Sequence, residues 1–475
     1  MPRAHSSSVD DGDAVKKEAN ALVSSSTALP APRCKRFSLG LAIAGLAFLS
    51  YLLGTAVMFF HLPSSDFFRQ AFQGARAWNE RQQLPPIPTE SAPPPTMSID
   101  KPDSTFDGFT LYACASLDVS STQAFLVNMR GEVVHHWAIP FSKVWPSPPH
   151  LRGPISDGFV CFFDVHLYPN GDLLAVFHGQ ENRVNGYGLV KLDKDSEVIW
   201  KHPRHIHHDV DVGEDGTIYA IAQKTVATMP AGLEDVPTPS LVDELVLLSG
   251  DGKELRKPIP ILEAFRDSPY APLLAALGTQ SKHDLSADVD PRHVLDNVSD
   301  NLHEPLHMNC VRVLPRRLAS KFPNFQVGQV LISLRNLHTI ALLDPQKEAV
   351  VWAAQGPWRA QHDAQFLENG HLLIFDNLGS AHGSRVLEYD PQTNAFPWWC
   401  PRGTRFGFLT KQRGMCQRLP NGNTLIVSSE QGTIWEVTPH QETVWTLLTN
   451  RFINSARRYR PEQLTFLARD IHARP

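Results

Sequence analysis

The stretch HHDVDVGEDGTIYAIAQ, residues 207–223, places short apolar segments on both sides of an Asp-Gly turn. Asp-Gly or Asn-Gly between such segments is the strongest short-range signal of a β-hairpin. The same pattern returns three more times, as LYPNGDLLAVF (167–177), FLENGHLLIFD (366–376) and RLPNGNTLIVS (418–428). The chain is therefore expected to be all-β and built from repeated hairpins.

A second type of hairpin alternates with the first. It has a short apolar strand, a polar turn and a strand that usually ends in Trp, and six copies occur: 124–137, 188–200, 244–255, 339–352, 385–399 and 433–445. Four strands in a unit of about 45–50 residues predict a β-propeller. Six outer hairpins favour six blades, and seven remain an alternative. The long spacing between Trp200 and Trp352 predicts an insertion at about 226–305, with a helical pattern at 261–278.

Histidines recur at one position of the inner hairpins. His208 and His362 each lie eight residues before the turn glycine, and His307 opens the corresponding strand of another unit. The innermost strands of a propeller line its channel, so their first residues should form a ring at one mouth. The next strand runs back antiparallel, which should bring Arg335 and Asn336 to the same mouth.

This combination of side chains suits an oxyanion better than a cation. Arg335 offers a planar fork of donors that stays charged, and the amide of Asn309 can add a further donor. Histidine can donate a proton, accept one or attack as a nucleophile near neutral pH. Asp209 and Asp363 follow their histidines directly, so on a regular strand they should face away and orient a neighbouring ring.

Three phrases in these hairpins resemble those of the bacterial arylsulfate sulfotransferases. They are LHMNCV (306–311), SLRN (333–336) and QHDAQ (361–365), and the resemblance covers about 106–460. That family consists of periplasmic six-bladed propellers that use no nucleotide sulfate donor. The resemblance implies sulfuryl transfer from an aryl sulfate to a phenol, with both small molecules as partners and without a cofactor or metal.

The resemblance also implies roles for individual residues. His362 would attack sulfur and carry the sulfuryl group as sulfohistidine. The residues that hold the sulfate oxygens would be His208, His307, Asn309 and Arg335. His208 would also carry the proton to and from the phenol oxygen. His207 and Asn336 complete the expected substrate-binding set, with His208 preferred to His207 because an aspartate follows it.

Two other classes of function stay open at this point. One is a non-catalytic propeller that binds a protein or a glycan at its mouth, because fold alone does not decide function. The other is a metal-assisted hydrolase that uses the histidine ring. The chain also departs from the family pattern: the insertion at 226–305 has no recognisable counterpart, and an apolar segment and a proline-rich segment occupy the place of an extra N-terminal β-domain.

The N-terminal quarter divides by composition. Residues 1–36 are expected to be a disordered cytoplasmic tail. Residues 37–60 carry no charge and have the length of a transmembrane anchor, although a cleaved signal peptide is the competing interpretation. Residues 61–105 should form a juxtamembrane helix and a proline-rich linker. Basic residues before the anchor then place the catalytic domain, 106–475, in the periplasm or an organelle lumen.

Charge and cysteine content exclude other classes. The net charge of −5 argues against a nucleic-acid partner, which would favour a basic surface. The six cysteines are widely spaced and form no C-x-x-C pair, so a zinc or thioredoxin-type site is not expected. The oligomeric state is not predicted.

Overall fold

The computed structural model of the chain describes residues 45–46, 48–54, 96–99, 101–115, 122–151, 155–179, 184, 186–279, 303–401, 407–449 and 451–467. The chain forms two compact units, residues 1–65 and 66–475. In the first unit the described residues, 45–46 and 48–54, are helical and lie within the predicted anchor. None of the helices in the described ranges combines the length and apolar character needed to cross a membrane. The rest of the predicted anchor and the tail lie outside the described residues.

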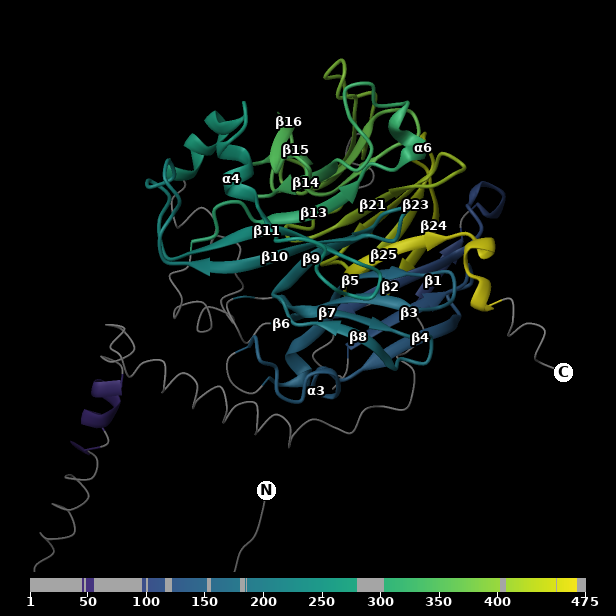
Figure 1. Cartoon of the computed structure of the whole chain (residues 1–475). Helices are drawn as coiled ribbons and strands as arrows, with labels where there is room; N and C mark the ends of the chain where they lie inside the picture. The colour runs from purple at the N-terminus through teal and green to yellow at the C-terminus, as the bar shows by residue number, and fades with distance from the viewer. Residues whose placement is uncertain are drawn as a thin grey trace, which may run out of the picture. The chain divides into compact units, whose positions relative to one another are not determined.

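Six antiparallel sheets make up the described part of the second unit (Figure 1). The sheets are described in the chain order of their innermost strands. The first sheet contains β5–β8 (Val160–Leu167, Leu173–Gly179, Gly186–Leu192, Val198–His202), and the second contains β9–β12 (Ile206–Val212, Ile218–Val226, Ser240–Leu248, Ile259–Pro260). The next two are β13–β16 (Met308–Val313, Val330–Leu334, Thr339–Asp344, Ala349–Gln355) and β17–β20 (His362–Phe366, Leu372–Asp376, Arg385–Tyr389, Trp398–Cys400). The fifth contains β21–β24 (Met415–Arg418, Thr424–Ser428, Thr433–Val437, Thr443–Leu448). The all-β, six-bladed propeller is confirmed, and the alternative of seven blades is wrong.

The sixth sheet joins the two ends of the propeller. The C-terminal strand β25 (Phe452–Tyr459) is innermost and pairs with β2 (Phe109–Ala115), followed by β3 (Thr122–Val127) and β4 (Val133–Ile139). The short strand β1 (Thr96–Ile99) pairs with the outer edge of β24. This strand lies inside the segment predicted as helix and linker, so the propeller begins earlier than expected, because Met97 and Ile99 pack against a blade core.

Short helices lie between the strands. They are η1 (Pro102–Ser104), α3 (Phe141–Val144), η2 (Asp157–Phe159), α4 (Ile261–Arg266), η3 (Ala271–Thr279), α6 (Arg316–Ala319) and η5 (Pro461–Gln463). The helical pattern expected at 261–278 is present as α4 and η3, separated near Pro269 because proline disfavours a continuous helix. The range 226–305 also contains the blade strands β11 and β12, so it is only partly an insertion.

Tryptophans at the ends of the outer strands connect neighbouring blades. The indole nitrogens of four of them donate to turn carbonyls of the next blade: Trp137 to Gly171, Trp200 to Gly250, Trp398 to Pro439 and Trp445 to Met129. Trp137 and Trp445 are completely buried. These contacts fix the outer rim of the propeller.

A second set of side chains connects the innermost strands around the channel. The carboxylates of Asp164, Asp209 and Asp363 accept backbone N–H groups of the next blade, from Val210, Val311 and Cys416. The amides of Asn309 and Asn454 donate to backbone carbonyls of the next blade, those of Gln361 and Phe162. The sulfur of Met415 accepts the N–H of Ala456 and completes the circle. We call this set the inner ring.

Two arginines neutralise the carboxylates of the inner ring. Arg312 donates to Asp209 at 2.5 Å and to Asp363 at 2.8 Å, and Arg457 lies 3.2 Å from Asp363. Asp209 and Asp363 thus bind backbone and guanidinium groups, and the expectation that they orient a neighbouring imidazole is wrong. Burial and the nearby Asp209 carboxylate raise the pKa of Asp164 to about 8, which reduces the negative charge at neutral pH.

The variant Arg312→Met should lower the free energy of unfolding by about 3–5 kcal/mol, because it leaves the buried Asp209 carboxylate without its cation and Asp363 with Arg457 alone. Arg317→Met is the control, since its pair with Glu368 is exposed and should contribute less than about 1 kcal/mol. Urea unfolding followed by tryptophan fluorescence measures both. Equal losses in the two variants would contradict the importance of the buried pair.

Candidate active site

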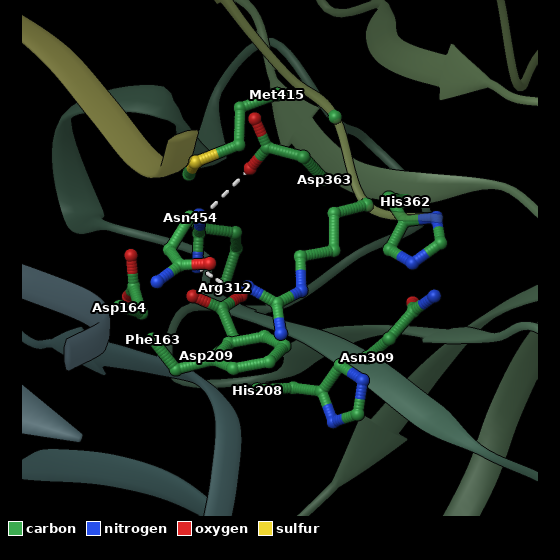
Figure 2. A pocket seen from close by; sticks show the side chains of 12 residues that line it. Phe163, Asp164, His208, Asp209, Asn309, Arg312, His362, Asp363, Met415 and Asn454 are labelled. Atoms are coloured by element: carbon green, nitrogen blue, oxygen red, sulfur yellow. Dashed lines mark hydrogen bonds and ion pairs between the residues drawn. The ribbon is translucent and has the colours of Figure 1, made fainter. Parts of the chain in front are cut away.

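A cavity brings together three of the residues predicted to meet at one mouth, His208, Asn309 and His362. Each of the six innermost strands contributes at least one lining residue, and the other three strands supply Phe163, Met415 and Asn454. His307 and Arg335 are not among the described residues that line it. Figure 2 shows the carboxylates of Asp164, Asp209 and Asp363 around the same cavity, so members of the inner ring line the site together with the histidines.

Irregular backbone geometry in the innermost hairpins determines the direction in which these side chains point. The pairing of the innermost strand shifts register at Phe162/Val165, Ala220/Ala222, Met308/Cys310 and His362/Gln365. His208, His307 and Asp363 have positive φ angles of 57°, 53° and 45°. A bulge adds a residue and breaks the strict alternation of faces. His208 and Asp209 consequently line the same cavity, which regular strand geometry had excluded.

His362 is held in one tautomer. Its Nδ1 lies 2.7 Å from Oδ1 of Asn377 and 3.0 Å from the carbonyl of Ala360, so it must donate a proton to these acceptors. The Asn377 amide nitrogen donates to the carbonyls of Thr410 and Arg413, which fixes its oxygen toward the ring. The lone pair of His362 is therefore on Nε2.

The charge state of His362 follows from its surroundings. The side chain is 6% exposed, and burial and the Arg335 guanidinium lower its pKa to about 3. The imidazole is neutral at physiological pH. A neutral ring with a fixed Nε2 lone pair has the properties of a nucleophile.

The other histidines form a chain: hydrogen bonds join His207 to His208 and His208 to His307, and a carboxylate lies near each end. Nε2 of His207 lies 3.3 Å from Asp243, and its Nδ1 lies 2.6 Å from Nδ1 of His208. Nε2 of His208 lies 3.1 Å from Nε2 of His307, whose Nδ1 lies 2.9 Å from Glu304. We call these five residues the histidine relay.

Burial and the surrounding histidines keep the pKa of His208 well below its usual value, so this imidazole is neutral at physiological pH. A neutral imidazole has one N–H group and one nitrogen with a lone pair. His208 therefore donates a hydrogen bond to one neighbouring histidine and accepts one from the other.

The remaining predicted residues take different positions. Asn309 uses its amide nitrogen on the carbonyl of Gln361, and its buried oxygen has no partner among the described residues. Arg335 donates its backbone N–H to His307 and lies near enough to His362 to lower its pKa. Asn336 holds the backbone carbonyl of Glu304 at 2.7 Å. Asn336 and the fully buried His207 therefore support the relay and do not line the cavity.

Several residues of the site were not among the predicted ones. Asp243 and Glu304 end the relay, Asn377 orients His362, and Arg413 lines the cavity. Gly414 lies eight residues before the turn glycine of its hairpin, as His208 and His362 do in theirs. Arg413 directly precedes Gly414, so aligning the hairpins could have identified this arginine. The hairpin repeat could not have identified Asp243 and Glu304, because Asp243 lies on β11, the third strand of its sheet, and Glu304 lies in a loop. No three His, Cys, Asp or Glu side chains in the described ranges are grouped like metal ligands.

The depressed pKa of His362 predicts a pH dependence of stability. Between pH 6.5 and 3 the unfolded chain binds a proton at this residue that the folded protein does not bind, so stability falls as the pH falls. This residue contributes about 1.4 kcal/mol per pH unit. His362→Asn should therefore flatten the slope of unfolding free energy between pH 6 and 4.5 by about that amount. The exposed His440→Asn is the control, and parallel slopes for native protein and His362→Asn would contradict the assignment.

Comparisons with solved structures give only remote likeness. They include a protein of unknown function from Bacteroides caccae (12% identity, 74% of this chain and 99% of that chain, TM-score 0.43). They also include virginiamycin B lyase from Staphylococcus aureus (8%, 60% and 69%, TM-score 0.33) and the WD40 propeller domain of Doa1 (9%, 72% and 74%, TM-score 0.34). No protein with a curated function matches the chain.

One comparison covers the site itself. The sequence profile described as arylsulfotransferase (ASST) matches residues 164–451, which is well over half of the chain. The match includes four of the six innermost strands in whole and half of a fifth, β5, together with the three predicted phrases and every residue of the histidine relay. The chain therefore belongs to the arylsulfotransferase family.

Proposed function

We propose that this protein transfers a sulfuryl group from an aryl sulfate to a phenol through a sulfohistidine on His362. The observation that carries the proposal is the state of His362, a buried neutral imidazole. Its Nδ1 proton is committed to Asn377 and Ala360, and its other nitrogen is left with a lone pair. Membership of the arylsulfotransferase family supports the same reaction class.

The first step would form one bond and break another. Nε2 of His362 attacks sulfur, the bond from sulfur to the aryl oxygen breaks, and the departing phenolate takes a proton from the histidine relay. The sulfated ring keeps its proton on Nδ1 and becomes cationic. The oxygens of Asn377 and Ala360 stabilise that positive charge, and Arg335 stabilises negative charge on the sulfuryl oxygens.

The second step would return the enzyme to its starting state. The hydroxyl oxygen of an acceptor phenol attacks sulfur, its proton passes to the relay, and the bond from Nε2 to sulfur breaks. The relay regains the proton that it lost in the first step. Atoms and protons balance over the cycle, and no redox change occurs.

The relay suggests His307 as the acid, in place of His208. His208 is neutral and both of its nitrogens are engaged by other histidines. Nδ1 of His307 lies 2.9 Å from the Glu304 carboxylate, a contact that would hold the proton on Nδ1 while Nε2 exchanges its proton with the phenol oxygen. The amide nitrogen of Gln223 donates to Glu304 and to Asp243 and so fixes both carboxylates.

The location of the reaction is a separate proposal. The uncharged segment 37–60 and the basic residues before it support an anchor with the propeller in the periplasm or an organelle lumen. An epitope placed before residue 37 that is protected from protease in intact spheroplasts, while the propeller is digested, would support this orientation.

His362→Ala should abolish transfer from 4-nitrophenyl sulfate to phenol, because the other described imidazole at the cavity, His208, uses both of its nitrogens on neighbouring histidines. Native protein incubated with donor alone should gain about 80 Da on the peptide that contains His362. Folded His362→Ala should gain no mass, and His440→Ala should behave as native protein. Turnover with no adduct in rapid-quench samples would contradict the covalent route.

Glu304→Gln should affect poor leaving groups selectively, because the carboxylate stabilises the proton that the phenolate needs. We expect kcat to fall roughly 100-fold with phenyl sulfate and less than about 5-fold with 4-nitrophenyl sulfate. Glu254→Gln is the control, since that carboxylate pairs with Arg204 at the surface. An equal fall in kcat for both donors would show that Glu304 does not assist protonation of the departing phenolate.

A further inference from the structure

Among the described residues, Arg413 has no carboxylate beside its guanidinium. Four arginines on the innermost strands, Arg312, Arg418, Arg457 and Arg458, each have a carboxylate partner. The guanidinium of Arg413 contacts none among the described residues, and its buried Nη1 has no hydrogen-bond partner there. It lies instead over the ring of Phe163 at 3.6 Å and near that of Phe452 at 4.9 Å.

The backbone of Arg413 is fixed by the group that orients His362. Its carbonyl accepts a hydrogen bond from the amide of Asn377, and its φ angle of 64° lies in the left-handed region. The adjacent Gly414 packs against Phe375, where a Cβ would come within 2.2 Å of the ring. Any larger residue at 414 would displace this turn.

The side chain faces the same cavity as His208, Asn309 and His362. Burial lowers the pKa of Arg413 to about 10, so the guanidinium is still charged at neutral pH. A partly buried charge without a partner is unfavourable, and an anion in the cavity would offset that cost. Stacking on Phe163 leaves the edge of the planar fork available for oxygen acceptors.

We infer that Arg413 binds the anionic end of the donor and so distinguishes a sulfate ester from a neutral phenol. This inference rests on the proposed function. Arg413, over Phe163, would then hold sulfate oxygens in the cavity that His362 also lines. Arg413 is assigned to donor binding, and no step of bond making passes through it.

A ligand that cannot react separates binding from catalysis. The probe is 4-nitrobenzenesulfonate, whose sulfur is bonded to carbon, and the neutral comparison ligand is 4-methylphenol. Isothermal titration of the full chain with each ligand measures native protein, Arg413→Gln, Arg413→Lys and Arg418→Gln. Arg418 is the matched control, because it also stacks on an aromatic ring, that of Trp398, but has Glu388 as its partner.

Arg413→Gln should weaken sulfonate binding about 10- to 100-fold, because it removes charge-assisted hydrogen bonds. Arg413→Lys should show a smaller loss, since it keeps the charge and loses the fork. All variants should bind 4-methylphenol within about twofold of native protein, and Arg418→Gln should bind both ligands normally. Sulfonate binding by folded Arg413→Gln at native strength would overturn the inference.

A crystal structure of native protein with the sulfonate covers the case in which Arg413→Gln does not fold. Sulfonate oxygens at about 3 Å from the Arg413 guanidinium are expected, and a sulfonate bound elsewhere, or none, would overturn the inference. Neither measurement requires turnover. Native protein that binds the sulfonate at Arg413 but transfers no sulfuryl group would contradict the proposed function alone. Transfer that is unaffected in Arg413→Gln, with unchanged KM for the donor, would contradict this inference alone.

Discussion

Each blade of the propeller is tied to the next by a side chain on its innermost strand, and the rest of the molecule depends on that circle of bonds. Asp164, Asp209 and Asp363 accept backbone N–H groups, while Asn309 and Asn454 donate to carbonyls. Innermost strands converge on an axis and cannot pair with each other as a sheet, so their backbone groups need partners of another kind. Short polar side chains next to the axis supply them.

The same circle determines where chemistry can occur. The carboxylates need cations, and Arg312 and Arg457 supply them, with Arg312 lining the cavity itself. Bulges next to the ring turn His208 and His362 toward the same cavity as the carboxylates. On an innermost strand, the residue that lines the candidate site is therefore followed directly by the residue that binds the next blade, as with His208 and Asp209.

Burial determines the charge states of the histidines and of Arg413 around the cavity. Histidines packed away from water lose their protons, as the lowered pKa values of His178, His208 and His362 show. Arginine keeps its charge even when its pKa is lowered to about 10, as at Arg413. The cavity consequently combines neutral imidazoles, aspartates of which Asp209 and Asp363 are paired with arginines, and the guanidinium of Arg413. The Arg413 cation is the group there that favours a bound anion, and the neutral His362 ring keeps a nucleophilic nitrogen.

The sequence by itself determined the hairpin repeat, favoured six blades over seven, and predicted that His208, His307, His362 and Arg335 lie near one another, because turn glycines and strand alternation are local features. It could not determine that Asp209 shares a cavity with His208, since a bulge depends on the neighbouring strand. It also could not bring Asp243, Glu304 and Asn377 to the histidines, because each comes from a different strand or loop. Only the tertiary structure decided which nitrogen of His362 keeps its proton, because that depends on an asparagine whose amide is held by a loop of the next blade.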